Sequence, residues 1–184
     1  MNEHPPTMRR PSNRSPRSFA APLSTGAWAG GIAVTVLLLG LAIGIPFSLP
    51  RSAWPAIAFT SLTCLLIPLI TSLFVVRGYE VTRKELIVQR LLWQTRFELG
   101  DLRAGRVDPD ALKRAWKTVG NGGFFGWIGY FRNKRLGNFR ALVTDPARSV
   151  VLEFANFKLV VSPDDPAAFV RVLDLPEPTE KAGR

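Results

Sequence analysis

The sequence predicts an α+β membrane protein, in which a two-helix transmembrane hairpin is followed by a small β-rich domain that ends in a helix. Two observations carry this prediction. The apolar residues are concentrated in two consecutive stretches, because no residue from 18 to 50 is charged and none from 52 to 76 is, and Arg51 alone separates them. From about residue 78 the pattern changes to short stretches of alternating apolar and polar residues, which is typical of strands.

The first 24 residues are rich in Pro, Ser and Arg and include the only histidine, His4. A segment of this composition has no apolar face to bury, so we predict a disordered basic tail over residues 1–24. A cleaved signal peptide is the alternative. It is disfavoured because the following apolar run is longer than a typical signal-peptide core and no clear cleavage site follows it.

Residues 25–76 are predicted to form the hairpin, with helices at about 28–49 and 53–76. Roughly 20 apolar residues span the hydrocarbon core of a bilayer, and each stretch reaches that length. Lys and Arg gather before the first helix and after the second, whereas the connecting loop carries only Arg51. The positive-inside rule therefore predicts a multi-pass protein of the plasma (inner) membrane with both termini cytoplasmic. Neither helix contains an ionisable residue, which favours an anchor over an ion path.

Small residues form one stripe along the first helix. Its glycines are Gly26, Gly30, Gly40 and Gly44. Small side chains let another helix approach closely. We interpret the stripe as the face that packs against the second helix of the same hairpin, because that partner is already tethered. Assembly with another copy, or with a larger complex, is the alternative.

The elements of the following domain are predicted from alternation and turn residues. Residues 79–90 indicate two strands with a turn at 83–85, residues 93–99 alternate with period two, and residues 100–107 indicate a further strand. Apolar residues at helical spacing between 108 and 119 predict a short helix with Asp108 as its cap. Residues 139–145 indicate a strand, and residues 149–162 indicate a hairpin with its turn near Asn156.

The chain ends in a predicted helix that begins near Pro166, capped by Ser162 or Asp165. Phe169 and other apolar residues at helical spacing give this helix a face to bury. After Leu175 the residues 176–184 are predicted to form a flexible tail.

Four segments together resemble the bacterial PH-like (pleckstrin-homology-like) domain family of small membrane proteins. They are GYEVTRKELIVQR, FELGDLRAGRV, GNGGFFGWIGYFRNKRLGNFRALVTD and FKLVVSPDDPAAFVRVL, and the glycine and aromatic block and SPDDPAAF are their specific parts. The resemblance covers residues 77–175 and implies a PH-like β-barrel of two near-orthogonal sheets, capped by the C-terminal helix. It implies no known enzymatic chemistry, and no inositol-phosphate motif maps onto this sequence.

The glycine and aromatic block admits several interpretations. Its glycines match neither a P-loop nor a dinucleotide-binding fingerprint, so we interpret them as permitting tight turns and close passage of backbones. Its aromatic residues suit stacking on nucleobases, contact with a membrane interface, or core filling. We expect most of them in the core, with Trp127 or Phe125 as the best candidate for an exposed tip beside the bilayer.

The formal net charge is +10, and basic residues cluster in the same block. The candidate contacts for anionic lipid head groups or for a protein partner are Arg132, Lys134, Arg135, Arg140 and Trp127. Near an anionic leaflet each Lys or Arg contributes about 1 kcal/mol of attraction. A second basic cluster comprises Lys113, Arg114 and Lys117. A solvated face is the alternative for both, and nucleic acid is not an expected partner because the lipid bilayer tether restricts access.

Catalysis is not expected. Asp164 and Asp165 are adjacent, but their place before a helix predicts capping. Cys64 is the only cysteine, so it has no disulfide or metal-binding partner in the chain. No catalytic, cofactor-binding or metal-binding residue is therefore predicted. The predicted function is a membrane-anchored cytoplasmic PH-like binding module that docks a protein partner or anionic lipid. The alternative is an accessory subunit of a larger membrane complex assembled through the hairpin, and a membrane enzyme is the least favoured class.

Overall fold

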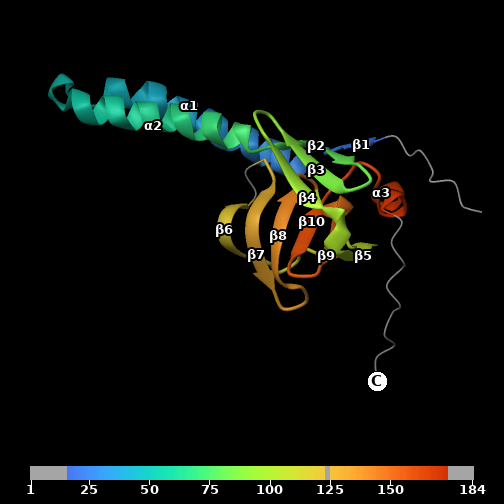
Figure 1. Cartoon of the computed structure of the whole chain (residues 1–184). Coiled ribbons are helices and arrows are strands. Elements are labelled where there is room, and N and C mark those ends of the chain that lie inside the picture. Colours follow the sequence, from blue (N-terminus) through green and yellow to red (C-terminus); the bar gives the residue numbers. More distant parts are fainter. Residues whose placement is uncertain (1–15, 123–124, 174–184) are drawn as a thin grey trace, which may run out of the picture.

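The computed structural model describes residues 16–122 and 125–173 and consists of two long helices that project from a sheet domain (Figure 1). Helix α1 spans Thr25–Ser48, a short 3-10 turn η1 spans Arg51–Ala53, and helix α2 spans Trp54–Leu73. Both lie close to their predicted limits and are long and apolar enough to cross a membrane. Only 11% of the most apolar window of α1, and 6% of that of the second helix with its preceding turn, is buried within the protein. The apolar surfaces of the helices are therefore mostly not covered by the sheet domain.

The segment before α1 corrects one prediction. Residues Arg17–Ala20 form strand β1, which pairs antiparallel with the strand that follows α2. The ring of Phe19 lies 5.1 Å from that of Phe169 in an edge-on contact. The prediction of disorder over residues 1–24 is wrong here, because one buried aromatic residue and an edge available for pairing outweigh a polar composition. Residues 1–15, His4 included, and the predicted tail over 176–184 lie outside the described residues.

Ten strands in the described ranges form two sheets. The four-stranded sheet has the order β1-β2-β3-β4, with β2 at Val76–Val81, β3 at Glu85–Arg90 and β4 at Gln94–Glu98. The six-stranded sheet has the order β5-β9-β10-β8-β7-β6. Its strands are β5 at Leu102–Val107, β6 at Trp116–Gly122, β7 at Trp127–Asn133, β8 at Gly137–Val143, β9 at Val150–Phe154 and β10 at Lys158–Val161. Short 3-10 turns lie at η2 (Leu99–Asp101) and η3 (Pro146–Arg148).

Strand pairing is antiparallel throughout both sheets except between β10 and β8, which are parallel. The β9–β10 hairpin thereby lies between β5 and β8. The predicted strand pairs over 79–90 and 149–162 are confirmed. Among the described residues no ladder joins the two sheets into one closed barrel, so each sheet keeps open edges.

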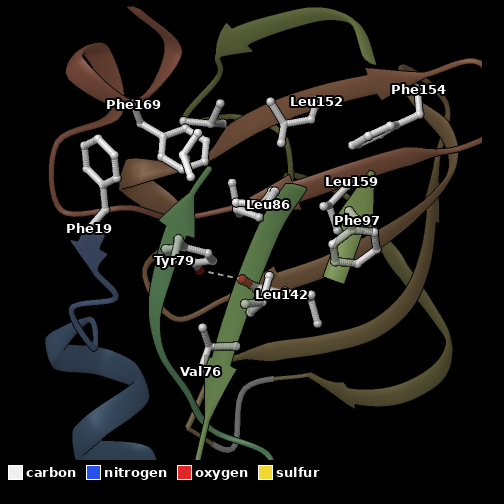
Figure 2. Packing of buried hydrophobic residues seen from close by; sticks show 14 of the residues in the cluster. Phe19, Val76, Tyr79, Leu86, Phe97, Leu142, Leu152, Phe154, Leu159 and Phe169 are labelled. Atoms are coloured by element: carbon white, nitrogen blue, oxygen red, sulfur yellow. Dashed lines mark hydrogen bonds between the residues drawn. The ribbon is translucent and has the colours of Figure 1, made fainter. Parts of the chain in front are cut away.

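The main core lies between the two sheets and is closed at one end by helix α3 (Pro166–Val172), whose Phe169 is fully buried beside Phe19 and Tyr79 (Figure 2). Asp165 caps α3 by accepting a hydrogen bond from the Ala168 N–H at 2.9 Å, as predicted. The C-terminal helix thus covers the end of the core at which β1 joins the sheet.

A buried polar network joins the two sheets. The Tyr79 hydroxyl donates to the Leu142 carbonyl at 2.7 Å (Figure 2). It also accepts from the Ser162 N–H at 3.0 Å. The Ser162 hydroxyl accepts from the N–H of Thr144. Ser162 therefore belongs to this network and not to the helix cap. Burial raises the pKa of the Tyr79 hydroxyl to about 12, because the ionised form loses hydration inside the core.

A second apolar cluster lies on the outer face of the six-stranded sheet and is covered by the segment between β5 and β6. This segment contains turns in place of the helix predicted between residues 108 and 119, and β6 begins already at Trp116. Arg114 has a positive φ of 53°, which ends any helical path. The helix prediction is wrong because the apolar residues of this segment cover the outer face of the sheet from a series of turns. Ala111 is fully buried against the sheet, and its carbonyl accepts from the Asn133 side chain at 2.8 Å.

Candidate binding surface

The inner face of the six-stranded sheet is only partly covered by the four-stranded sheet. Ile128 and Leu142 lie in the core between the sheets, and Tyr130 and Arg132 follow on the same face of β7. A bulge between Lys117 and Val119 places Trp116 opposite Arg132 and Val119 opposite Tyr130. All four side chains therefore lie on the inner face, and we call them the open face.

The open face exposes large apolar side chains. Trp116 is 80% exposed, Val119 65% and Tyr130 55%. Arg132 is exposed and forms no ion pair within the part of the chain that the structure describes. Contiguous exposed apolar residues with a polar rim are typical of interaction sites, and Trp, Tyr and Arg are the residues enriched among those that dominate binding energy.

Glycines bring the backbones of β6 and β7 close together beside the open face. Gly120 lies opposite Gly129, and their φ angles are 122° and 140°. A Cβ on Gly129 would overlap the carbonyl oxygen of Val119, and one on Gly120 would overlap that of Ile128. The interpretation of these two glycines as permitting close passage of backbones is confirmed.

Two arginines, one from each sheet, face the space between the sheets, and we call Arg90 and Arg140 the arginine pair. Arg90 ends the inward-facing row of β3 after the fully buried Leu86 and Val88. Arg140 lies opposite Tyr130 on the inner face of β8. The guanidinium carbon of Arg140 lies 5.4 Å from the ring centre of Phe97 and 5.8 Å from that of Tyr130.

The structure does not bring the predicted basic cluster together. Arg135 donates to both carboxylate oxygens of Asp108, at 2.6 and 2.5 Å, and so is held by an ion pair. Lys134 lies in the β7–β8 turn, at the end of the sheet domain away from α1 and α2 (Figure 1). Arg140 lies apart from them on the inner face of β8, beside Phe97 and Tyr130. Of the predicted basic residues, Arg132 and Arg140 thus belong to the candidate surface.

The two predicted aromatic tips occupy other places. Trp127 is partly buried and packs against the outer cluster of the six-stranded sheet. Phe125 has a positive φ of 57°, and its ring lies against Gly31 of α1, where a Cβ would overlap it. Phe125 thus ties the β6–β7 connection to the first helix. Phe124 lies outside the described residues.

The glycine stripe of α1 does not pack against α2. A Cβ on Gly26, Gly30, Gly40 or Gly44 would meet nothing within 4 Å. The buried residues of α1 are instead Ala27, Gly31 and Ala42, and the Ser61 hydroxyl of α2 donates to the Ala42 carbonyl at 3.1 Å. The interpretation of the stripe as the α1–α2 contact is wrong, because the four glycines face open space and the contact with α2 includes Ala42.

Sequence reasoning missed Arg90, although a signal was present. In the alternating row Leu86, Val88, Arg90, the arginine occupies an inward position of a strand whose other inward residues are apolar. A charged side chain at such a position is uncommon unless it has a partner. Trp93 was likewise treated only as part of an alternating strand.

Two packed sheets around one core, closed at one end by a C-terminal helix and bearing an exposed aromatic and basic surface, define a PH-like domain of the kind that serves as a binding module. A family profile described as bacterial PH domain matches residues 77–175, which is more than half of the chain. The chain therefore belongs to the bacterial PH domain family, as the sequence resemblance indicated. Neither the comparison with curated proteins nor that with solved structures found a match.

Proposed function

We propose that this protein is a membrane-anchored binding module, in which α1 and α2 cross the plasma (inner) membrane and the sheet domain docks a protein partner on its cytoplasmic side. The observation that carries the proposal is the exposure of the two apolar helices, of which 11% and 6% of the most apolar windows are buried. A soluble protein would bury such helices, because exposing their apolar surface to water is costly.

The pairing of β1 with β2 supports a hairpin that enters and leaves the membrane on one side. β1 ends at Ala20, before α1, and β2 begins at Val76, after α2, and the two strands are hydrogen-bonded neighbours. Both outer ends of the hairpin therefore meet in one sheet. Arg17 and Arg77 flank these ends, and basic flanks favour the cytoplasmic side.

The open face is the docking surface that the geometry favours for a protein partner. Its exposed Trp116, Val119 and Tyr130 offer apolar contact area, and Arg132 is an unpaired cation at its edge. We expect an acidic segment with apolar residues as the partner, because complementary charge steers association and fixes register. The module binds without catalysing a reaction in this proposal.

Site-specific photocrosslinking in native membranes tests this function. A photoreactive residue at Val119 is expected to give one discrete protein adduct, which Arg132→Glu reduces several-fold because it reverses the charge at the edge of the face. The same residue at Gly100, which is exposed on the far side of the domain, is the matched control. Equal adduct patterns at the two positions would reject the open face as the docking surface.

A second candidate function is an accessory subunit of a larger membrane complex, assembled through α1. The open space beside Gly26, Gly30, Gly40 and Gly44 favours it, since that face of the hairpin is free to meet another helix. A Gly40→Leu and Gly44→Leu double variant is expected to lose co-purification with such a complex in mild detergent. Retention of the complex would count against this candidate.

A further inference from the structure

The arginine pair places two positive charges at inward positions of the two facing sheets. Arg90 comes from β3 of the four-stranded sheet and Arg140 from β8 of the six-stranded sheet. Aromatic rings hold both guanidinium groups, because that of Arg90 lies 5.6 Å from the ring centre of Trp93 and that of Arg140 lies beside Phe97 and Tyr130. Such contacts fix the direction of a guanidinium group while leaving its N–H donors free.

No carboxylate in the described ranges pairs with either arginine. The Nε atom of Arg90 is buried and has no hydrogen-bond partner in that part of the chain. Burial, and then the charge of Arg140, lower the pKa of the Arg90 guanidinium. A guanidinium group such as that of Arg90, which has lost part of its hydration and has no counter-charge, is unfavourable. An anion between the two arginines would offset this cost and accept the free N–H donors.

Trp93 connects Arg90 to the end of α2. Phe74 follows the last residue of α2, and its ring lies 5.0 Å from that of Trp93 in an edge-on contact. The Arg90 N–H donates to the Trp93 carbonyl at 3.1 Å, which closes the β3–β4 turn. This turn lies at the end of the sheet domain from which the helices project (Figure 1).

The tip of the β3–β4 turn is apolar. Leu91 is 43% exposed and Leu92 is 70% exposed. Exposed leucines beside a Trp are suited to the boundary between head groups and acyl chains, where Trp is also enriched. A turn on the outer surface of a soluble domain has no comparable reason to expose two adjacent leucines.

We propose that Arg90 and Arg140 bind the phosphate of an anionic phospholipid head group at the foot of α2, while Leu91 and Leu92 enter the interface of the same leaflet. The N–H donors of both arginines would bind the phosphate oxygens, since guanidinium groups bind phosphate with two parallel hydrogen bonds. This site rests on the proposed membrane anchoring and adds a lipid class and a fixed orientation to it. The open face would then be held at a defined height above the bilayer.

Native mass spectrometry of the full-length protein in detergent tests the phosphate site. We expect phosphatidylglycerol to bind more tightly than phosphatidylcholine with the same acyl chains. Arg90→Gln and Arg140→Gln are each expected to weaken phosphatidylglycerol binding about tenfold or more, as the loss of a charge-assisted hydrogen bond implies. Arg103→Gln in β5 is the matched control, because Arg103 is exposed and forms no ion pair within the described residues, and it is expected to leave lipid binding unchanged.

Two results would overturn the site. One is equal phosphatidylglycerol binding by the wild type and by both variants of the arginine pair. The other is displacement of bound phosphatidylglycerol by millimolar inorganic phosphate as effectively as by soluble phosphatidylglycerol, which would assign the pair to a free anion.

If the arginine variants do not fold, a labelling experiment on protein that retains both arginines still tests the proposal. In a Cys64→Ser background, an environment-sensitive fluorophore on Leu92→Cys is expected to be quenched by brominated lipids in liposomes. The same label on Asn138→Cys, which is exposed near the β7–β8 turn, is expected to remain unquenched. A Leu92→Cys label as unquenched as the Asn138→Cys label would overturn the interfacial contact.

The same set of labels distinguishes failure of the lipid contact from failure of membrane insertion. A label on Leu62→Cys in α2 reports membrane insertion alone. If it stays in water, the anchoring fails and this proposal fails with it. If it is quenched while the Leu92→Cys label is not, only the proposal of a lipid contact fails.

Discussion

Two halves of one sheet face differ in what lies against them. On β8, β9 and β10 the inward residues Leu142, Leu152 and Leu159 are buried beneath the four-stranded sheet (Figure 2). On β6 and β7 the inward residues beyond the buried Ile128, namely Trp116, Val119 and Tyr130, are largely exposed. Apart from the bulge in β6, side chains alternate between the two faces in both halves. Alternation therefore identifies a strand and its two faces, and it does not tell whether a face is core or binding surface, because the position of the covering sheet decides that.

Two alanine variants, one in each half, are expected to show the largest difference in stability. Leu152→Ala in the covered half is expected to lower the free energy of unfolding by about 2–5 kcal/mol, because it leaves a cavity in the core. Trp116→Ala in the open half is expected to change it by less than about 0.5 kcal/mol, although the removed side chain is larger. Pulse proteolysis of the full-length protein in urea measures both. Similar losses for the two variants would contradict the division of the face.

The close passage of β6 and β7 gives the next largest effect. Gly129→Ala is expected to destabilise the protein by about 2 kcal/mol or more, because Gly129 has a φ of 140° and a Cβ there would overlap the Val119 carbonyl oxygen. Gly100→Ala is the control, since a Cβ there meets nothing within 4 Å. Thermal melting of the two variants compares them, and a Gly129→Ala variant that melts with the wild type would show that the strands separate without cost.

The buried network of the covered half is expected to contribute less. Tyr79→Phe removes the hydroxyl that pairs with Leu142 and Ser162, and we expect a loss of about 1–3 kcal/mol from the polar groups left unsatisfied. Tyr130→Phe in the open half is the matched control, because within the described residues its hydroxyl has no hydrogen-bond partner. A loss as large for Tyr130→Phe would contradict the comparison.

The same network predicts a dependence on pH. The pKa of Tyr79 is raised from 10.0 to about 12 in the folded protein, so the unfolded chain releases this proton first as the pH rises. The associated stability is fully present below pH 10 and is lost between pH 10 and about 12. Unfolding measured across this range is expected to show a smaller decline for Tyr79→Phe than for the wild type. Parallel declines would show that Tyr79 does not titrate with folding.

The smallest effect concerns the β7–β8 turn. Arg135→Ala is expected to destabilise the protein by about 1 kcal/mol, because Arg135 pairs with both oxygens of the mostly buried Asp108 but is itself half exposed. Lys134→Ala, at a neighbouring exposed residue without an ion pair in the described ranges, is expected to change stability very little. Urea unfolding of the two variants at one salt concentration makes the comparison. Equal effects would restore the view of this turn as a free basic cluster.

The sequence was sufficient for features that depend on length or period. Two uncharged stretches of bilayer length predicted α1 and α2, and alternation predicted the strands that pair over residues 79–90 and 149–162. Features that depend on a distant partner were not predictable in the same way. β1 has four residues and gains its stability from β2, which follows it only after both helices, and residues 108–115 have helical spacing because they cover a sheet.

The candidate surface shows the same limit. Arg140 was predicted from the density of positive charge, but charge density also selected Arg135, which is held by Asp108. The row Leu86, Val88, Arg90 contained the information that Arg90 faces inward. Only the arrangement of the two sheets shows that Arg90 faces the same space between the sheets as Arg140.

The pairing of β1 with β2 also determines when the four-stranded sheet can form during synthesis. Phe19 is synthesised before both helices, and its partners Tyr79 and Phe169 are synthesised after them. The first strand must therefore wait in an unpaired state while the whole hairpin is made. A fragment that starts at residue 77, where the family match begins, would lack this strand and leave an edge of β2 open. To express the sheet domain alone, residues 16–24 should therefore be fused to it through a linker, so that β1 can pair with β2.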